Sequence, residues 1–480
     1  MSYPNVIKGK AGVQAKNAVF RLNSCFSFYH IWVTHGSKDD VLQCRILEKH
    51  ERQENVKAMQ ADSTDQSRSH VTEPSSSSYW QETVSHPVLS DDLPSGADVA
   101  IIGGGVLGSA ICYWLARAGI AAIVLERTRL AFEASGRNGG FVSIGPAESY
   151  TGAIARLGYE TARAVLDLTR ENQVLLRRIL DEEQIACEYR EPGTLSLALD
   201  ANRLEALTQE VAALQAEGVA AKLLDRAEVQ ELVRTPPGPE IVGGKFLPEG
   251  GTIHPVRLVQ GLMKAAQRYG ARTCAATVRQ LVQHEGRVVI HTSRGTLSTE
   301  RVIVAANAWI GELIPQLAQL IIPVRGQVLA YAPISPVFTT AMSASVTLTG
   351  EYWQQRSDGT IVLGGCRAVA PGNDVGIRLN QPTPEVQKAL EQIFPRLFPA
   401  LHGLQVATRW AGVMAFTPDY LPIVDRVPDM PGVLVAGGFS GHGMPFPIRL
   451  GQLLAESISS GRWPAALRLF GLNRETLMGR

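Results

Sequence analysis

The sequence predicts an α/β protein, and three observations support this prediction. Strand-like and helix-like runs alternate after residue 96, the pattern of strands joined by crossover helices. A buried-strand pattern, a glycine-rich turn and a helix pattern follow one another in DVAIIGGGVLGSAICYWLARAGIAAIVLER, residues 98–127. A second strand-rich zone covers residues 324–366. We therefore expect a parallel sheet together with a separate strand-rich part.

Size and charge narrow the class of protein. A chain of 480 residues is too long for one ordinary core, so we expect two domains or one interleaved pair. Hydrophobic residues make up 45% and charged residues 19%, which suits a folded chain. With 46 basic and 45 acidic residues, no net field favours nucleic acid or an anionic membrane. A small-molecule partner fits this balance, and the oligomeric state stays open.

The cysteines and apolar runs predict a cytoplasmic protein without a metal site or a membrane span. No CxxC pair and no clustered histidines occur, and no apolar run approaches the roughly 20 residues of a membrane helix. The stretch FSFYHIWV is too short for an anchor and follows no signal-peptide pattern. The six cysteines are dispersed as Cys25, Cys44, Cys112, Cys187, Cys274 and Cys366.

The first part of the chain differs from the rest. It shows little periodicity, and residues 60–78 are polar, Ser-rich and turn-prone. Such a segment buries too little apolar surface to offset its ordering entropy, so we expect residues 1–78 to form a disordered extension. Residues 1–58 are expected to be dispensable for folding and cofactor binding.

Local patterns place several further elements. Helices are expected at residues 159–180, 203–217 and 255–269. The stretch from Asp225 to Glu228 resembles a capping box. Residues 357–359, Ser-Asp-Gly between two β-prone runs, predict a hairpin turn.

The glycine-rich turn has the complete context of a Rossmann-like dinucleotide fingerprint. Gly103, Gly105 and Gly108 have the spacing that permits a tight turn, close approach to a pyrophosphate and close helix packing. Glu126 ends the second strand, 23 residues after Gly103. A carboxylate there accepts hydrogen bonds from the ribose hydroxyls of an adenosine. This motif alone leaves FAD and NAD as alternatives.

Two distant segments favour FAD. The loop ASGRNGGF, residues 134–141, is of a kind that runs alongside an extended flavin, although alone it also fits a flexible turn. Residues 431–458, PGVLVAGGFSGHGMPFPIRLGQLLAESI, predict a strand, a glycine-rich turn and a helix. We expect this turn and the positive end of its helix to face an anionic group, and a reduced flavin is one such group.

With these motifs the sequence resembles the D-amino-acid oxidase-like FAD-dependent oxidoreductases, which include glycine oxidase, sarcosine oxidase and gamma-glutamylputrescine oxidase. The resemblance covers roughly residues 79–460 and is nearest to the gamma-glutamylputrescine oxidase branch in the ASGRNGG loop. Other motifs that carry it are SYWQET, EGGTIHPVRL, RVIVAANAW, PVRGQV, YWQQRSDG, VMAFTPDYLPIVD and GGFSGHGM.

The resemblance implies a Rossmann-like FAD-binding domain interleaved with an α+β substrate domain built on a mainly antiparallel sheet. The FAD-binding parts are expected at residues 79–185, 241–322 and 405–465, and the substrate parts at residues 186–240 and 323–404; residues 466–480 would form a C-terminal tail.

The resemblance also implies which residues form the site. Tyr352 and His442 are the candidate catalytic residues, although Tyr352 equally fits an aromatic residue of a half-buried strand and His442 a turn residue that presents only its amide. No cysteine stands shortly before the TPD stretch, so the flavin is expected to be non-covalent. The expected FAD-binding residues are Gly103, Gly105, Gly108, Glu126, Arg127, Ser135, Arg137, Asn138, Gly139, Val278, Ala305, Ala306, Gly438, Phe439, Ser440, Gly441, His442, Gly443 and Met444.

The implied reaction is oxidation of the C–N bond of an amine or amino acid, with hydride transfer to the flavin and hydrolysis of the imine. Oxygen or another acceptor would reoxidise the flavin. Two other functions stay open: a flavoprotein module acting on modified tRNA, and a non-catalytic FAD-binding protein with a blocked pocket.

Overall fold

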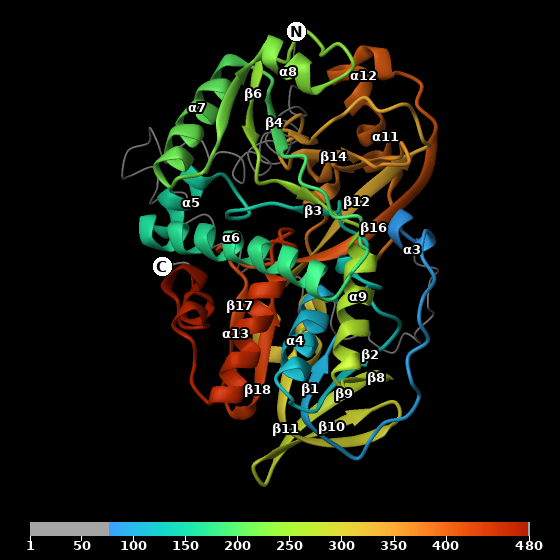
Figure 1. Ribbon diagram of the computed structural model, residues 1–480, viewed down its shortest axis with the longest axis vertical. Helices are drawn as coiled ribbons and strands as arrows, with labels where there is room; N and C mark the ends of the chain where they lie inside the picture. Colours follow the sequence, from blue (N-terminus) through green and yellow to red (C-terminus); the bar gives the residue numbers. More distant parts are fainter. Residues whose placement is uncertain (1–75, 479–480) are drawn as a thin grey trace, which may run out of the picture. The chain divides into compact units, whose positions relative to one another are not determined.

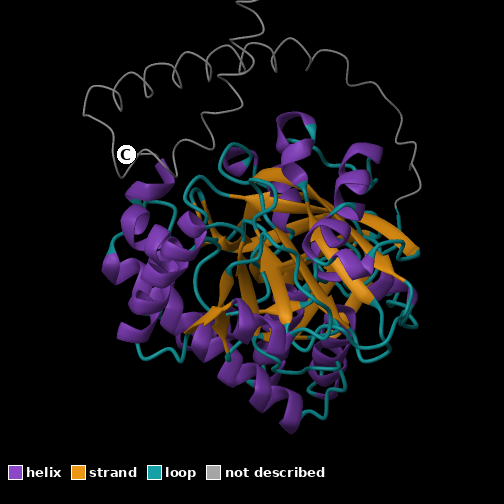
Figure 2. Cartoon of the chain, turned by 90° about the horizontal axis from the view of Figure 1, so that it is seen from above, coloured by secondary structure: helices purple, strands orange, loops and turns teal. Residues whose placement is uncertain are grey.

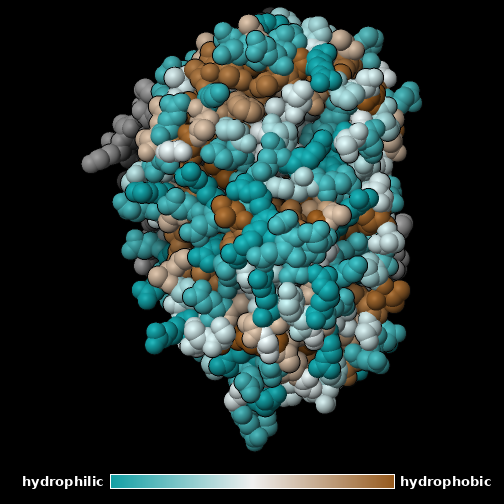
Figure 3. Space-filling view, viewed as in Figure 1, coloured by the Kyte–Doolittle hydropathy of each residue, from teal (hydrophilic) through white to brown (hydrophobic). Residues whose placement is uncertain are grey.

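The computed structural model describes residues 76–478, and the extension expected at residues 1–78 lies almost wholly outside this range. Strands form the interior of the described part, and helices surround them (Figure 2). The face shown in Figure 3 is mainly hydrophilic, with apolar side chains gathered in small groups. Two eight-stranded sheets organise the fold.

The first sheet is the parallel sheet that the fingerprint predicts. Its order is β17-β18-β11-β1-β2-β8, and β18, β11, β1, β2 and β8 run parallel. Strand β17 is antiparallel to β18, and the hairpin β9–β10 extends from β11. The strands are β1 (Gly96–Ile102), β2 (Ala122–Glu126), β8 (Arg272–Ala275), β9 (Val278–His284), β10 (Arg287–Thr292), β11 (Gly295–Val304), β17 (Ile423–Val427) and β18 (Met430–Gly437).

Three helices pack together on one face of this sheet, and two more lie beside them (Figure 1). Helix α4 lies between α9 and α13 and begins directly after the glycine turn. The long helix α6 contacts both α5 and α13. These helices are α4 (Val106–Arg117), α5 (Tyr150–Leu157), α6 (Tyr159–Glu182), α9 (Pro255–Arg268) and α13 (Pro447–Ser460); the short α3 (Tyr79–Glu82) and α10 (Ile310–Leu313) flank the sheet.

The second sheet is antiparallel except where β13 runs parallel to β4. Its order is β16-β12-β15-β14-β13-β4-β6-β5. Its strands are β4 (Thr194–Ala198), β5 (Lys222–Asp225), β6 (Gly243–Leu247), β12 (Ile322–Tyr331), β13 (Ala341–Ala344), β14 (Glu351–Gln355), β15 (Ile361–Gly365) and β16 (Val406–Phe416). A two-stranded ribbon is formed by β3 (Phe141–Val142) and β7 (Gly251–Thr252).

The two faces of the second sheet differ, as alternation in strands requires. Leu195, Met342 and Trp353 belong to a core that is closed by helices α8, α11 and α12. Ser196 and Ser343 alternate with these apolar residues and face the opposite side, where α7 lies against β6. The helices are α7 (Ala201–Ala216), α8 (Arg226–Leu232), α11 (Pro384–Glu391) and α12 (Ile393–Leu397).

The local expectations are confirmed. Helices α6, α7 and α9 cover the three expected ranges to within two residues. The side chain of Asp225 and that of Glu228 make both hydrogen bonds of the capping box. Strands β14 and β15 form the expected hairpin around residues 357–359.

The division of the chain into alternating segments remains a prediction. Strand β16 fits it least well, because it pairs along its whole length with β12 of the second sheet although residues 405–465 were assigned to the first domain. Within residues 76–478, no helix has the length and apolarity to cross a membrane, and no three acidic, His or Cys side chains gather as a metal site.

The contact between Gly108 and the glycine turn gives a test of the fold. A Cβ atom on Gly108 would lie 2.0 Å from the carbonyl oxygen of Gly103, a backbone atom that cannot give way cheaply. We expect Gly108→Ala to lower the free energy of unfolding by about 1–3 kcal/mol, measured by denaturant titration. The matched control is Ser109→Ala, because the buried Ser109 hydroxyl has no partner among the described residues. Equal stability of the two variants would contradict the packing argument.

Candidate functional site

A cavity of about 870 Å³ runs from the carboxyl ends of β1, β2 and β11 to the polar face of the second sheet. Its walls include the glycine turn, the loop after β2, the segment after β18 and strands β4, β6, β13 and β14. One continuous space therefore joins the two sheets.

The glycine turn forms a cradle at one end of this cavity. Gly103 has φ +111°, and a Cβ atom there would lie 2.8 Å from the carbonyl oxygen of Ala305. A Cβ atom on Gly105 would lie 2.9 Å from the hydroxyl of Ser135. The Ser135 hydroxyl also accepts a hydrogen bond of 2.9 Å from the amide of Val106, at the start of α4. The glycines thus leave open the surface where a pyrophosphate would approach the helix.

Glu126 is fixed at the end of β2 by backbone amides. Its two carboxylate oxygens accept hydrogen bonds of 2.8 Å each, from the amides of Gly104 and Thr128. Burial raises the pKa of Glu126, and the two amides oppose this shift. The carboxylate lines the cavity, where it fits the role of a ribose acceptor.

The loop after β2 is held by side chains that bind its carbonyl oxygens. Trp410 of β16 donates its indole N–H to the Arg137 carbonyl at 2.8 Å, and Trp80 of α3 donates to the Asn138 carbonyl at 2.7 Å. Gln354 of β14 donates to the carbonyls of Gly139 and Gly140.

The SYWQE segment before the fingerprint completes this support. The Ser78 hydroxyl donates to the Gly136 carbonyl. Gln81, only 2% exposed, donates its amide to the carbonyls of Ala131 and Phe132 at 2.9 and 2.8 Å. The carbonyls of residues 131, 132 and 136–140 therefore have donors from other segments.

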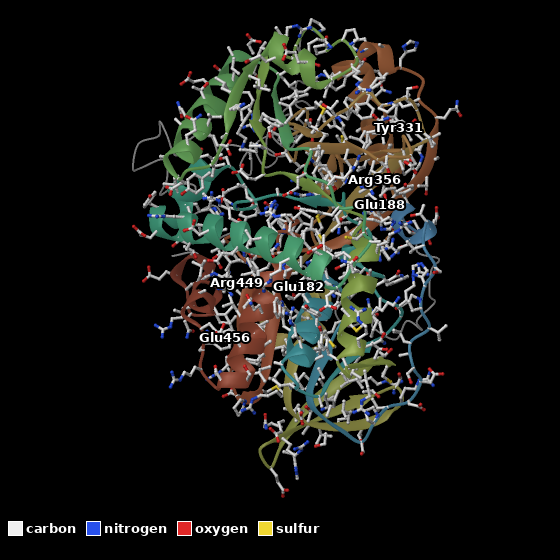
Figure 4. All side chains as sticks on the ribbon, viewed as in Figure 1. Glu182, Glu188, Tyr331, Arg356, Arg449 and Glu456 are labelled. Carbon is white, nitrogen blue, oxygen red and sulfur yellow. The ribbon has the colours of Figure 1, made fainter. Side chains whose placement is uncertain are left out.

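An ion pair lies beside this loop. Arg356 is 3% exposed, stacks over the ring of Trp80 at 5.1 Å and donates to Gln354 at 3.0 Å. Its partner is Glu188, and Figure 4 labels the two residues beside each other near α3. The pair thus reinforces Trp80 and Gln354, the two residues that hold the loop.

The segment after β18 offers amides to the cavity. The Gly438 amide donates a hydrogen bond to the side-chain oxygen of Asn307. The Ser440 hydroxyl accepts a hydrogen bond from the Thr417 amide and lies 3.3 Å from the Thr417 hydroxyl. In the described part of the chain, the amides of Gly441, Gly443 and Met444 have no acceptor, and all three residues line the cavity.

At the start of α13, in contrast, two backbone amides already have an acceptor within the protein. Asn172 of α6 caps it, since its side-chain oxygen accepts hydrogen bonds from the amides of Ile448 and Arg449 at 2.9 and 3.1 Å. A buried side chain from a distant helix therefore satisfies these two amides. The expectation that the turn before α13 faces an anionic group remains a prediction, and Gly441, Gly443 and Met444 are the residues whose amides are available for it.

Tyr352 and His442 both line the cavity and carry no charge near neutral pH. Burial raises the pKa of the Tyr352 phenol to about 12 and lowers the pKa of the His442 imidazole to about 4. His442 Nε2 is 3.1 Å from the carbonyl oxygen of Gly145. Because a carbonyl only accepts, Nε2 carries the proton, which leaves Nδ1 as an acceptor.

Two glycines, Gly139 and Gly364, leave the space that the Tyr352 ring occupies. A Cβ atom on Gly139 would lie 2.6 Å from this ring, and one on Gly364 would lie 2.5 Å from it. Phe141 packs edge-on against the ring at 5.6 Å. The glycine-rich loop therefore positions Tyr352 as well as shaping the cavity.

Most of the residues expected at the site line the cavity. Three do not, and each shapes the backbone of a neighbouring segment: Gly108 packs on Gly103, Gly438 has φ +76°, and Ser440 binds Thr417. The expected residues that line the cavity are Gly103, Gly105, Glu126, Arg127, Ser135, Arg137, Asn138, Gly139, Val278, Ala305, Ala306, Tyr352, Phe439, Gly441, His442, Gly443 and Met444.

The sequence analysis missed the cavity wall formed by the second sheet. Thr194, Ser196, Ser343 and Lys245 line the cavity from three neighbouring strands, and Glu210 does so from α7. The alternation of polar and apolar residues in TLSLA was the available signal, since it places Thr194 and Ser196 on one face.

Three features place the protein in the class of dinucleotide-dependent oxidoreductases. They are the parallel sheet with its open glycine turn, the carboxylate bound by backbone amides, and the cavity that reaches a second sheet. The chain belongs to the FAD dependent oxidoreductase (DAO) family, whose model matches residues 98–457. This confirms the resemblance that the motifs indicated, and FAD is the cofactor of the family. The glycine cradle, the amide-bound carboxylate of Glu126 and the available amides fit this cofactor.

Two curated relatives match along most of their length. The chain is 27% identical to gamma-glutamylputrescine oxidoreductase from Escherichia coli over 390 residues, covering 79% of this chain and 88% of the relative. It is 28% identical to glycine oxidase from Pseudomonas aeruginosa over 376 residues, covering 76% and 95%.

Solved structures share the fold. Glycine oxidase from Geobacillus kaustophilus superposes with a TM-score of 0.69 at 22% identity, covering 80% of this chain and all of that one. L-amino acid deaminase from Proteus vulgaris, without its specific insertion, gives 0.65 at 21% identity, covering 82% and 96%. Both comparisons confirm the fold class.

The support of the loop by Gln81 gives a test of the site. In Gln81→Ala, the buried carbonyl of Ala131 and the partly buried carbonyl of Phe132 lose their donor, and loss of the donor to a buried carbonyl costs about 1–3 kcal/mol. We expect the dissociation constant for FAD to rise roughly tenfold or more, measured by quenching of flavin fluorescence on the apoprotein. The control is Gln260→Ala, whose amide binds the carbonyl of Ser85 at an exposed position. Unchanged FAD affinity in Gln81→Ala would show that the loop holds its shape without this side chain.

Proposed function

We propose that this FAD-dependent oxidoreductase oxidises the C–N bond of an amine or amino acid. The observation that carries the proposal is the single cavity that joins the glycine cradle to Tyr352, His442 and the polar face of the second sheet. The names of the relatives support it, since they specify gamma-glutamylputrescine, glycine and L-amino acids.

The residues named above divide into two groups in this proposal. The cradle and the amide-rich segment after β18 hold FAD without a covalent bond, and no cysteine of the described part lines the cavity. Tyr352 and His442 contact the substrate. When bound, FAD supplies a two-electron acceptor for a hydride from the carbon next to nitrogen. The protein supplies orientation and exclusion of water.

The neutral side chains of Tyr352 and His442 favour a neutral amine as the reacting form of the substrate. Tyr352 and His442 are uncharged near pH 7, and the wall beside them includes Phe141, Met414 and Met444. A desolvated, apolar wall disfavours an ammonium ion unless an anion pairs with it. The amine therefore reacts in its deprotonated form, which holds a lone pair that assists loss of the hydride.

A cytoplasmic location belongs to the proposal as well. Its support is that the four cysteines of the described part, Cys112, Cys187, Cys274 and Cys366, are unpaired and buried, as in a reducing compartment. Small-molecule substrates fit the balanced charge of the chain, which has 46 basic and 45 acidic residues.

The reaction is tested by anaerobic reduction of the bound flavin. Purified protein should be yellow and release FAD on acid precipitation, and at least one member of a panel of primary amines, N-methyl amino acids and D- or L-amino acids should bleach the flavin absorbance. The control is the same panel with free FAD. A yellow protein that no member bleaches would favour a non-catalytic or tRNA-directed role.

The pH dependence of flavin reduction tests whether the substrate amine, and not Tyr352 or His442, is the group that titrates. Neither Tyr352 nor His442 titrates between about pH 6 and 9, so the rate should rise with pH through the pKa of the substrate amine. Replacing the substrate by a less basic fluorinated analogue should move the rising part of the pH–rate profile to lower pH. His442→Gln should leave the rising part of the pH–rate profile at the same pH. A rising part that stays fixed when the amine changes would assign the titration to the protein.

A further inference from the structure

The turn between β16 and β17, residues 417–421, is held by the last residues that the structure describes. Asp419 of this turn is 2% exposed. Its carboxylate accepts two hydrogen bonds from the Arg474 guanidinium, at 2.6 and 2.9 Å, and one from the Thr476 hydroxyl at 2.7 Å. The preceding residues 465–470 contact β17 and α13, beside the C-terminus in Figure 1. The C-terminal segment is therefore fastened to the turn by a buried ion pair.

Every N–H donor of the Arg474 guanidinium has an acceptor. Besides the two bonds to Asp419, Nη2 donates to the Leu421 carbonyl at 2.9 Å, and Nη1 donates to the carbonyls of Phe470 and Gly471 at 2.9 and 3.1 Å. These bonds account for the five N–H groups of an arginine. Burial alone would raise the pKa of the Asp419 carboxyl, but hydrogen bonds, chiefly from Arg474, outweigh it and hold the pKa below its usual value. The ion pair is therefore charged near neutral pH, and a lysine could not reproduce its geometry.

The same turn holds the amide-rich segment after β18. The Leu421 carbonyl, which Arg474 binds, also accepts a hydrogen bond of 2.7 Å from the Thr417 hydroxyl. The Thr417 amide donates to the Ser440 hydroxyl at 3.2 Å, and a Cβ atom on Gly438 would lie 2.6 Å from the Thr417 methyl group. A continuous series of hydrogen-bonded residues thus runs from Arg474 to Ser440.

Ser440 decides the direction of the amides that follow it. Its φ is +51°, in the left-handed region, which costs free energy for a residue with a side chain and persists where the surroundings hold it. The bond from Thr417 and a hydrogen bond of 2.7 Å from the Ser440 amide to the Ala415 carbonyl provide this hold. The three cavity-lining amides that lack an acceptor within residues 76–478 follow directly, in residues 441–444. A shift at Ser440 would therefore turn these amides relative to the cavity.

We propose that Arg474 is a positioning residue that raises the reduction potential of the bound FAD. It fixes the turn at residues 417–421, this turn fixes Ser440, and Ser440 keeps the following amides directed at the flavin. A reduced flavin is anionic, and hydrogen bonds to an anion are stronger than those to a neutral group, so well-directed amides bind reduced FAD more tightly than oxidised FAD. This difference in binding raises the potential. The inference rests on one part of the proposed function, that the amide-rich segment holds FAD, and is independent of the substrate.

The test is the midpoint potential of FAD bound to Arg474→Gln, measured by anaerobic titration with dithionite and a reference dye in the absence of substrate. We expect binding of reduced FAD to weaken roughly tenfold more than binding of oxidised FAD, which lowers the potential by about 30 mV. Thr476→Val removes only one hydrogen bond to Asp419 and keeps the ion pair, so it is the milder variant in case Arg474→Gln does not fold. It should lower the potential by about 14 mV, which corresponds to a threefold change.

Two further variants separate positioning from a general loss of stability. Arg268→Gln breaks a similar ion pair, with the buried Glu183, outside the cavity, and should leave the potential unchanged. Ser440→Ala acts at the other end of the series that begins at Arg474. Because both changes act on one series, the double variant Arg474→Gln/Ser440→Ala should lower the potential by less than the sum of the two single shifts.

The outcomes separate this inference from the proposed reaction. An unchanged potential in Thr476→Val and in folded Arg474→Gln, an equal fall in Arg268→Gln, or fully additive shifts would overturn positioning by Arg474. A lowered potential in Arg474→Gln alone of the two arginine variants, in a protein that no amine bleaches, would support positioning and contradict amine oxidation. Bleaching by an amine, with equal potentials in the wild type, Arg474→Gln and Thr476→Val, would support amine oxidation and contradict positioning.

Discussion

The site depends on hydrogen bonds from buried side chains to the carbonyl oxygens of one irregular loop. Residues 131–140 form neither a long helix nor a strand, so their backbone groups lack the partners that regular structure provides. Indole and amide donors of Trp80, Gln81, Gln354 and Trp410 replace them. These donors belong to α3, β14 and β16, so the same bonds that satisfy the loop also join the first sheet to the second. A cavity between two sheets keeps a defined shape only if such a junction is stiff.

This constraint reaches the residues proposed for catalysis. Because the loop is fixed, Gly139 presents a flat surface on which the Tyr352 ring lies, and Gly364 provides the second surface from the neighbouring strand. The buried charge of Arg356 is part of the same arrangement, since it is neutralised by Glu188 and covers the indole of Trp80. A side chain at Gly139 or Gly364 would therefore collide with the Tyr352 ring and displace it. The glycines thus set the position of the Tyr352 ring as well as the shape of the cavity.

Patterns of residues close in sequence predicted the helices, strands and turns. The features that they did not predict depend on contacts between residues far apart in sequence. The strand, turn and helix around Gly103, the capping box at Asp225 and the hairpin at residues 357–359 each depend on residues close in sequence, and all were correct. The cap on α13 was not foreseen, because Asn172 lies more than 270 residues away from the amides it binds. The partners of the loop carbonyls were missed for the same reason. Sequence patterns report which residues are polar, whereas the pairing of strands decides which of them meet.

The distribution of charge decides where substrates are distinguished. The Tyr352 phenol and the His442 imidazole are neutral near pH 7, so these two side chains themselves give little discrimination by charge. Binding energy from parts of a substrate remote from the reacting bond can still position that bond. In this protein such energy is available along the face of β13, β4 and β6, where hydroxyls and then charged groups follow one another. Under the proposed function, this face of the second sheet is where contacts remote from the reacting bond can form.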